Sequence, residues 1–292
     1  MEKAVSEKTK AIMPVHFLGH PARMDAIMDI AHDNELLVVE DCCEAYKAYY
    51  KGKAAGTFGD MATYSFFAAH HIATEGEGGM ITTDRRELSS TARSIRAFGR
   101  ACNCPVCLVT LDSSFYCPQR HVVDGREMEG GDKRCLFTYI GYSVKMGELN
   151  AVYGLEQLKK VEGFQKIREE NARYLNDQLK RYEEIIQFPV EGKGAKHSWF
   201  AYPLTIIKVA PFSREELVKH LEDAKIETRP LMAGNLLHQP AMEGVNYRQV
   251  GSLSVTNHVM DNGVIIGCYH GIGKEEREYQ AQVIKEFVEK YA

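Results

Sequence analysis

Apolar and polar positions alternate along the first hundred residues in a way that predicts strands and helices following one another. Helical spacing of apolar residues predicts helices over 21–32 and 87–98. Compact apolar runs predict strands over 11–17, 36–39, 62–67 and 80–83. Short apolar runs between helices are typical of strands buried on both faces of a parallel sheet. The pattern therefore predicts an α/β domain with a mostly parallel sheet.

The pattern changes after residue 98. Residues 99–135 are rich in Cys, Gly, Asp and Pro and show no clear period, which is typical of a functional or disordered segment. A helical pattern follows over 148–182, with a break expected near Gly163. The remaining segments are predicted as strands over 199–207, 226–229 and 264–266 and as helices over 214–224 and 274–291. We therefore expect a large domain over 1–162, which carries the Cys-rich insertion at about 99–135, and a small C-terminal α+β domain over 163–292.

Charge excludes some classes of partner. Among 292 residues there are 36 Lys and Arg and 40 Asp and Glu, a net charge of −4. This balance gives no reason to expect nucleic acid or an anionic membrane as a partner. No apolar run reaches the roughly 18 residues of a membrane span, and residues 1–8 are charged and lack a signal-peptide core. We expect a cytoplasmic protein.

Asp41 is a first candidate for chemistry because it follows a buried strand at its carboxyl end. Ligands bind at this edge of open α/β sheets. A carboxylate there can keep a pyridinium nitrogen protonated, which makes a cofactor ring an electron sink. Taken alone, Asp41 also fits the plainer role of capping a turn after a strand.

Four short motifs are Glu40-Asp41-x-x-Glu44-Ala45, Phe58-Gly59-Asp60, Ser65-Phe66 and Gly76-Glu77-Gly78-Gly79. Together they resemble the motifs of a known family, the DegT/DnrJ/EryC1/StrS sugar aminotransferases. The resemblance implies the fold type I of pyridoxal-phosphate-dependent transferases, which is like that of aspartate aminotransferase. In this family the residue five after the serine is the lysine that binds pyridoxal phosphate, and here it is His70. A histidine forms no stable imine, but it can act as a general acid or base near neutral pH.

Within the family the chain is similar to the 3-dehydrase branch. The residues that carry this similarity are His70-His71, the segment 229–236 and Gln239-Pro240. Enzymes of this branch remove the 3-hydroxyl of a nucleotide-linked 4-keto-6-deoxyhexose in 3,6-dideoxysugar pathways, which serve lipopolysaccharide O-antigen biosynthesis. The resemblance implies a CDP-linked substrate and pyridoxamine or pyridoxal phosphate as cofactor. A buried, hydrogen-bonded histidine is the alternative for His70.

The resemblance also assigns roles to individual residues. His70 would move a proton at the C4′ carbon of the cofactor, and Asp41 would pair with the ring nitrogen. Glu44 would lie beside the ring 3-oxygen, and Ser65 would contact the phosphate. Ser143 stands where an asparagine of the family reaches the neighbouring subunit's phosphate, so we expect a homodimer.

Cysteines divide the branch further. Its CDP-sugar enzymes carry a [2Fe–2S] cluster that a separate NADH-dependent flavin iron–sulfur reductase reduces. Their four ligands are similar in position to Cys43, Cys102, Cys104 and Cys117. The gap before Cys117 is longer than in the branch, which leaves Cys107 as an alternative fourth ligand. Zinc is the rival metal for four close thiols.

Two other functions stay open. The chain could be a cluster-free dehydratase that uses pyridoxal phosphate and glutamate, as in the colitose pathway, or a non-catalytic binding protein. Residues 9–12 correspond to a point well inside a normal family member, so the helix N-terminus that cradles the cofactor phosphate is expected to lie outside this sequence.

Overall fold

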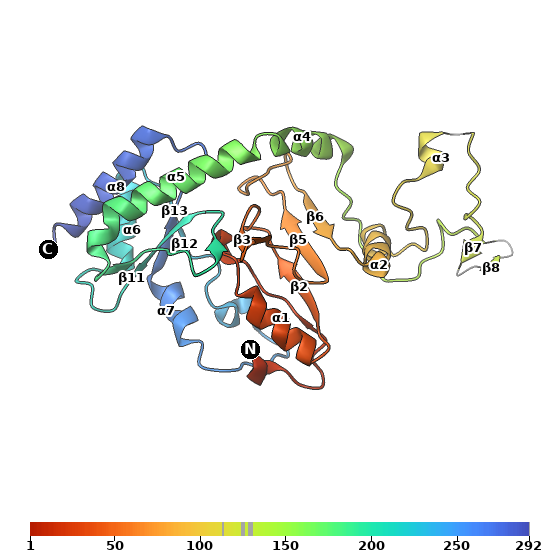
Figure 1. Cartoon of the computed structure of the whole chain (residues 1–292), viewed down its shortest axis with the longest axis horizontal. Coiled ribbons are helices and arrows are strands. Elements are labelled where there is room, and N and C mark those ends of the chain that lie inside the picture. Colours follow the sequence, from red (N-terminus) through yellow and green to blue (C-terminus); the bar gives the residue numbers. More distant parts are fainter. Residues whose placement is uncertain (113, 124–125, 128–130, 292) are drawn as a thin grey trace.

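Two four-stranded sheets organise the chain (Figure 1). The computed structural model describes residues 1–112, 114–123, 126–127 and 131–291. The first sheet has the order β1-β2-β5-β6, with β1, β2 and β5 parallel and β6 antiparallel to β5. These strands are β1 (Ala11–Ile12), β2 (Leu37–Asp41), β5 (Met61–Ser65) and β6 (Gly79–Thr82). The prediction of an α/β fold with a mostly parallel sheet is confirmed.

Helix α1 (Met24–Asp33) covers the first sheet through its apolar side. Met24, Ile27 and Ala31 recur at helical spacing and form a buried cluster with Val38 of β2. The strand expected over 11–17 stops at Ile12. Pro14 follows shortly after and has no N–H to donate, which interrupts the ladder. Val15 then forms an isolated parallel bridge with Asp41 before a 3₁₀ helix begins at Phe17–Gly19.

The second sheet has the order β12-β13-β11-β9 and is antiparallel throughout. Three helices pack beside it around a core that runs from Ala172 to Val288. These elements are β9 (Ile186–Gln187), β11 (Tyr202–Ile206), β12 (Thr228–Pro230), β13 (Gly263–Ile266), α5 (Val161–Leu179), α6 (Arg214–Asp223) and α8 (Lys274–Val288). The expected boundary at 162/163 falls in the first turn of α5 and stays a prediction.

The long helical pattern over 148–182 contains a break, but its position differs from the predicted one. Helix α4 (Glu148–Leu158) ends three residues before α5 begins at Val161, so the break lies at Lys159–Lys160. Gly163 lies inside the first turn of α5. A single glycine costs a helix only about 1 kcal/mol, which the buried face of α5 outweighs.

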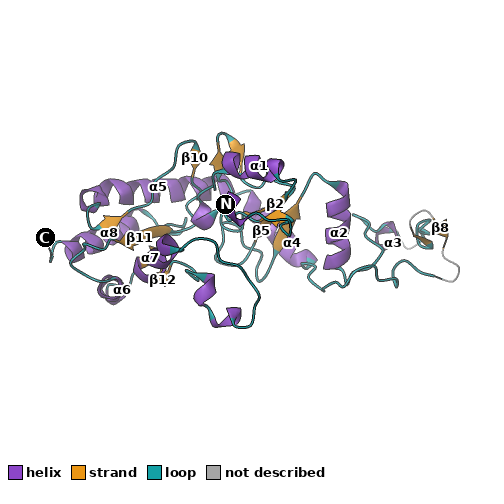
Figure 2. Ribbon diagram, turned by 90° about the horizontal axis from the view of Figure 1, so that it is seen from below, coloured by secondary structure: helices purple, strands orange, loops and turns teal. Residues whose placement is uncertain are grey.

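The remaining elements are short or lie at the margins. A three-stranded sheet joins β10 to β3 and β4, which links the late residues 195–196 to residues 49–54. The Cys-rich segment with α3, β7 and β8 lies at one end of an elongated molecule, opposite α8 (Figure 2). No helix in the described part of the chain is both long and apolar enough to cross a membrane. The remaining elements of the chain are β3 (Tyr49–Tyr50), β4 (Lys53–Ala54), β7 (Val122–Val123), β8 (Arg126–Glu127), β10 (Ala195–Lys196), α2 (Arg86–Arg96), α3 (Leu108–Leu111), α7 (Ser254–Asn262) and 3₁₀ helices at Glu2–Ala4, Lys180–Tyr182, Leu236–His238 and Pro240–Met242.

Candidate active site

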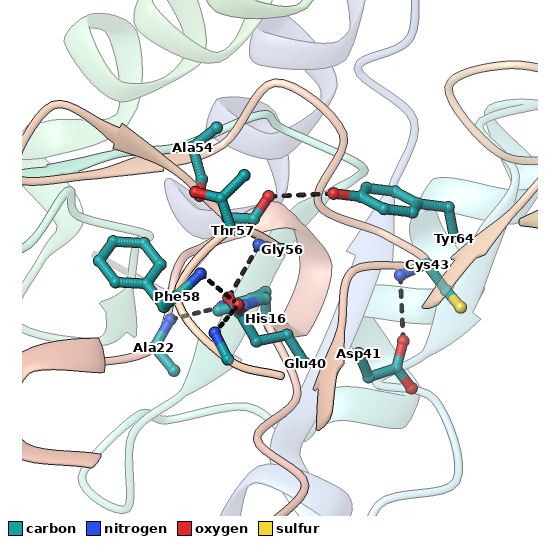
Figure 3. Close-up of polar contacts among 12 residues, drawn as sticks. His16, Ala22, Glu40, Asp41, Cys43, Ala54, Gly56, Thr57, Phe58 and Tyr64 are labelled. Carbon is teal, nitrogen blue, oxygen red and sulfur yellow. Dashed lines mark hydrogen bonds and ion pairs between the residues drawn. The ribbon is translucent and has the colours of Figure 1, made fainter. Parts of the chain in front are cut away.

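A buried carboxylate, Glu40, fixes the end of β2 (Figure 3). It accepts hydrogen bonds from the backbone N–H groups of Gly56 at 2.8 Å and of Phe58 and Gly59 at 2.7 Å. His16 Nε2 adds a fourth at 3.0 Å, and both side chains are fully buried. Burial alone would raise the pKa of Glu40, but the bonds from His16 and the three backbone groups outweigh burial and lower it.

The same network resembles a metal site in its spacing only. Ligand atoms of His16, Glu40 and Cys42 lie within 4.8 Å of one another. However, His16 Nδ1 already accepts the Ala22 N–H at 2.9 Å, so Nε2 carries the proton that it donates to Glu40. Burial raises the pKa of the Cys42 thiol. The network therefore serves to hold the turn over residues 56–59 against β2.

Asp41 lies next to Glu40 and belongs to the opposite face of the strand. Its backbone is held by the Pro14 carbonyl at 2.9 Å and by the His16 N–H at 3.0 Å. Its Oδ1 accepts the Cys43 N–H at 3.0 Å, as Figure 3 shows. The Oδ2 atom has no hydrogen-bond partner among the described residues. One carboxylate oxygen at the carboxyl edge of the sheet is therefore available to a ligand.

His70 lies in the turn after β5, and its imidazole is enclosed by two aromatic rings. The ring centroids of Phe67 and Phe200 are 5.8 Å and 5.1 Å from that of His70. Within the part of the chain that the structure describes, neither ring nitrogen is hydrogen-bonded, and Nδ1 is buried. Burial lowers the pKa of His70, with Asp41 opposing this effect and Arg168 adding to it. The imidazole is therefore favoured in its neutral form near pH 7.

His71 differs from its neighbour in its deeper burial and in the hydrogen bond that its Nε2 makes. It is almost fully buried, and its Nε2–H donates to the Ser198 carbonyl at 3.0 Å. Burial, followed by the charge of Arg168, lowers the pKa of His71 to about 3. His71 thus has the features of a structural histidine, whereas His70 makes no such bond.

Glu44 follows β2 in the chain, and Ser65 ends β5, the strand that pairs with β2. Glu44 Oε2 accepts the Leu18 N–H at 2.7 Å. Burial raises the pKa of Glu44, the bond from Leu18 lowers it, and the charge of Asp41 raises it further, so that the net shift is upward. Ser65 ends β5 and its Oγ accepts the Phe67 N–H at 3.2 Å. A small crevice is lined by Cys43, Ser65 and His71 among others. Asp41 acts on the pKa of both Glu44 and His70, and it pairs with Thr63, two residues before Ser65, so these residues lie near the carboxyl ends of β2 and β5.

Ser143 lies apart from that group. It is exposed, and it pairs with Ala97 just beyond α2 in an isolated antiparallel bridge. Its expected contact with a neighbouring subunit stays a prediction.

Two residues near His70 were not predicted. Arg168 of α5 is buried, and its charge acts on both histidines. Phe200 packs on His70 and on His71. The only sequence signal for Arg168 is its position on the buried face of α5. Val161, Gln165 and Ala172 of the same helix are buried at helical spacing with it.

The fold and site can now be compared with known proteins. The profile of the DegT/DnrJ/EryC1/StrS aminotransferase family matches residues 1–287, and the chain belongs to this family. Escherichia coli GDP-4-keto-6-deoxy-D-mannose-3-dehydratase, solved with bound hydrated PLP, superposes with a TM-score of 0.82 at 32% identity. That match covers 97% of this chain and 69% of the relative. The predicted PLP-dependent transferase fold is thereby confirmed.

Two curated relatives match nearly the whole chain. The chain is 38% identical to the lipopolysaccharide biosynthesis protein RfbH of Salmonella typhimurium, over 98% of this chain and 64% of that protein. It is also 38% identical to dTDP-4-dehydro-2,6-dideoxy-D-glucose 3-dehydratase of Saccharopolyspora spinosa, over 99% of this chain and 62% of that protein. The chain therefore spans somewhat less than two thirds of the length of these relatives.

The predicted iron–sulfur cluster is wrong. A [2Fe–2S] cluster needs four thiolates around two irons. Among the described residues, the only group of three or more His, Cys, Asp or Glu side chains whose ligand atoms lie within 4.8 Å of one another is His16, Glu40 and Cys42, which contains a single thiol. Cys43 lies at the end of β2, and burial together with Asp41 raises its pKa to about 11. Cys102, Cys104 and Cys117 belong to the segment after α2. The solved 3-dehydratases are named with PLP and with a PLP–glutamate geminal diamine, and with no cluster.

Proposed function

We propose that this chain catalyses, or supplies the catalytic residues for, the C-3 dehydration of a nucleotide-linked 4-keto-6-deoxyhexose with pyridoxamine or pyridoxal phosphate as cofactor. The observation that carries the proposal is the state of His70. It stands where the family has its cofactor-binding lysine, and its imidazole is half-buried, favoured neutral and without a hydrogen bond in the described part of the chain.

The donor set at the sheet edge fits the proposed cofactor. Asp41 offers one unpaired carboxylate oxygen to a pyridinium nitrogen, and Ser65 offers a hydroxyl hydrogen, because its oxygen already accepts the Phe67 N–H. Glu44 is half-buried, and burial raises its pKa, which favours the protonated form that can donate a hydrogen bond to a ring oxygen. When bound, the ring supplies an electron sink for the reaction.

His70 is proposed as the base of this reaction. A neutral imidazole can accept a proton from the C4′ carbon of the cofactor, and Asp41 then stabilises the imidazolium that results. The Phe67 and Phe200 rings pack against this imidazole and shield part of it from water. His70 replaces the lysine of the family and forms no stable imine with the cofactor. Non-covalent contacts such as those of Asp41 and Ser65 must therefore retain it.

The proposal also concerns which nucleotide the sugar substrate carries. The motif resemblance favours CDP, whereas related 3-dehydratases are named for dTDP- and GDP-linked sugars. The reductase was expected only as the partner of an iron–sulfur cluster and is not part of the proposal. Cytoplasmic location stays a prediction.

Turnover tests the proposal directly. The purified chain is incubated with pyridoxamine phosphate, with and without L-glutamate, and with the CDP-, dTDP- or GDP-linked 4-keto-6-deoxyhexose. Formation of the 3-deoxy sugar is followed by mass spectrometry as the net loss of one oxygen, because the 3-hydroxyl leaves as water while the amine cofactor supplies two electrons and L-glutamate would restore the amine. We expect turnover of one of the three, and His70→Asn should reduce it by about 10²–10⁴-fold, the usual contribution of a general base. Turnover by His70→Asn at the wild-type rate would refute the base role.

We also propose a homodimer. Ile140 and Leu149 are 94% and 87% exposed, and Val144 and Val152 are exposed as well. They surround Ser143 and the start of α4, where apolar side chains this exposed indicate an interaction surface. Sedimentation velocity should show a dimer that Leu149→Asp converts to a monomer, and a wild-type monomer at micromolar concentration would contradict the proposal.

A further inference from the structure

Arg168 is a buried cation without an acidic partner. It lies in the middle of α5 and is 2% exposed. No ion pair to Arg168 is found among the described residues. A guanidinium keeps its charge in proteins, so an unpaired one inside the fold is costly and calls for an explanation. Its Nε is also buried without a hydrogen-bond partner.

A single nitrogen of Arg168 holds two consecutive carbonyl groups. Nη1 donates to the Trp199 carbonyl at 2.9 Å and to the Phe200 carbonyl at 2.8 Å. Trp199 has a φ of 54°, a left-handed conformation that is strained for a residue with a Cβ. A strained turn of this kind persists only when its surroundings hold it, and Arg168 provides two of the bonds that do so.

The segment that Arg168 holds is the one that packs against the two histidines. The Ser198 carbonyl accepts the His71 Nε2–H at 3.0 Å. The Phe200 ring lies 5.1 Å from the His70 ring and 6.0 Å from the His71 ring. A shift of the Trp199–Phe200 carbonyls would therefore move the ring that packs against His70.

We propose that Arg168 is a positioning residue for His70, acting through the Trp199 and Phe200 carbonyls that it holds and through the Phe200 ring that this turn places against the imidazole. The inference rests on the proposed role of His70 as a base, and it names a residue of α5 that prepares His70 for that role.

The electrostatics of the site agree with this placement. The charged groups that act on His70 are Asp41 from β2 and Arg168 from α5. His71 follows it in the same turn and stays neutral, and the Phe67 and Phe200 rings carry no charge. Burial lowers the pKa of His70 most, Asp41 opposes this, and Arg168 reinforces it. Loss of Arg168 should therefore raise the pKa of His70.

Two substitutions at Arg168 separate positioning from general stability. Arg168→Met removes both carbonyl bonds and the charge. Arg168→Lys retains them in principle, because one nitrogen makes both bonds and an ammonium has three donors. Arg173→Met is the matched control, since Arg173 is an exposed arginine of the same helix.

The readouts do not require catalysis. In ¹H–¹³C NMR of the histidine- and phenylalanine-labelled chain, the nuclear Overhauser contact between the His70 and Phe200 rings and the titration of His70 are recorded, with His70 assigned from His70→Asn. We expect Arg168→Met to lose the contact and to raise the His70 midpoint by about half a pH unit or more. Arg168→Lys and Arg173→Met should retain both. Where turnover is measurable, Arg168→Met should lower it about tenfold or more.

Several results would overturn the proposal. One is an Arg168→Met chain that keeps the ring contact and the wild-type titration, and another is Arg168→Lys behaving like Arg168→Met. If Arg168→Met does not fold, Phe200→Leu continues the test, because it removes the ring and leaves Arg168 in place. An unchanged His70 titration in Phe200→Leu would refute the route through Phe200. Absence of turnover in the wild-type chain would instead count against the proposed function and leave the NMR test intact.

Discussion

The buried Glu40 network makes a quantitative prediction about stability. Each Glu40 oxygen accepts two hydrogen bonds: Oε1 from the Phe58 and Gly59 N–H groups, and Oε2 from His16 and the Gly56 N–H. Glu40→Gln retains one oxygen and turns the other into an NH₂ group. Two of the four donors then face another donor and lose their acceptor.

The cost can be worked from those two lost bonds. A hydrogen bond to a charged group contributes about 1.5–3 kcal/mol, and a buried unsatisfied donor costs a similar amount. We therefore expect Glu40→Gln to lower the free energy of unfolding by about 3 kcal/mol or more at pH 7. Urea unfolding followed by far-UV circular dichroism measures this, with exposed Glu184→Gln as the control. A loss below about 1 kcal/mol would refute this account of the network.

The pH dependence gives an independent check of the same prediction. The pKa of Glu40 is lowered in the folded chain, so its carboxylate stabilises the fold above the unfolded pKa, and this stabilisation is lost as pH falls through the folded pKa. The difference in unfolding free energy between wild type and Glu40→Gln should therefore be full at pH 7 and shrink as the pH is lowered below about 4.5. A difference that stays constant down to pH 3 would contradict the sign of the shift.

Three further predictions follow from packing and burial. Gly59→Ala should destabilise the fold, because its Cβ would meet the Val38 carbonyl oxygen at 2.5 Å, and an unchanged thermal midpoint would contradict this. Gly163→Ala should stabilise the fold by up to about 1 kcal/mol, since beyond the nearby backbone of α5 no described atom lies within 4 Å of the added carbon, and a lower midpoint would be the contrary result. His71 should show no titration between pH 5 and 8 by ¹⁵N NMR, because its pKa is about 3, and a midpoint within that range would disprove its structural assignment.

Local patterns were enough to predict the elements that carry the site. A buried apolar run ending in Glu40-Asp41 specified β2, and the motif after Ser65 located His70 at a strand end. The apolar run predicted a strand over 11–17, but the strand is shorter. Pro14 has no N–H to donate to the ladder, and the prediction gave more weight to the apolar run than to this single residue. The break between α4 and α5 was placed at Gly163 because glycine is the usual interruption signal, although the chain breaks at Lys159–Lys160.

Long-range relations were not predictable in the same way. The resemblance to the CDP-sugar enzymes implied that Cys43 joins Cys102 and Cys104, but the positions of cysteines along a chain carry no information on whether segments far apart in sequence meet. Arg168 and Phe200 approach His70 from more than ninety residues away, and no local pattern records that. His16 was missed for the same reason, since its partner Glu40 lies 24 residues further along.

The central claim is that His70 moves a proton at the C4′ carbon of the cofactor. It is tested most directly by proton exchange at that carbon, measured on the purified chain with C4′-deuterated pyridoxamine phosphate and the nucleotide sugar that the chain turns over. Cofactor binding is quantified separately by absorbance for wild type and His70→Asn. The account predicts exchange in the wild type and a loss of about 100-fold or more in His70→Asn at equal cofactor occupancy. Undiminished exchange in His70→Asn would contradict it.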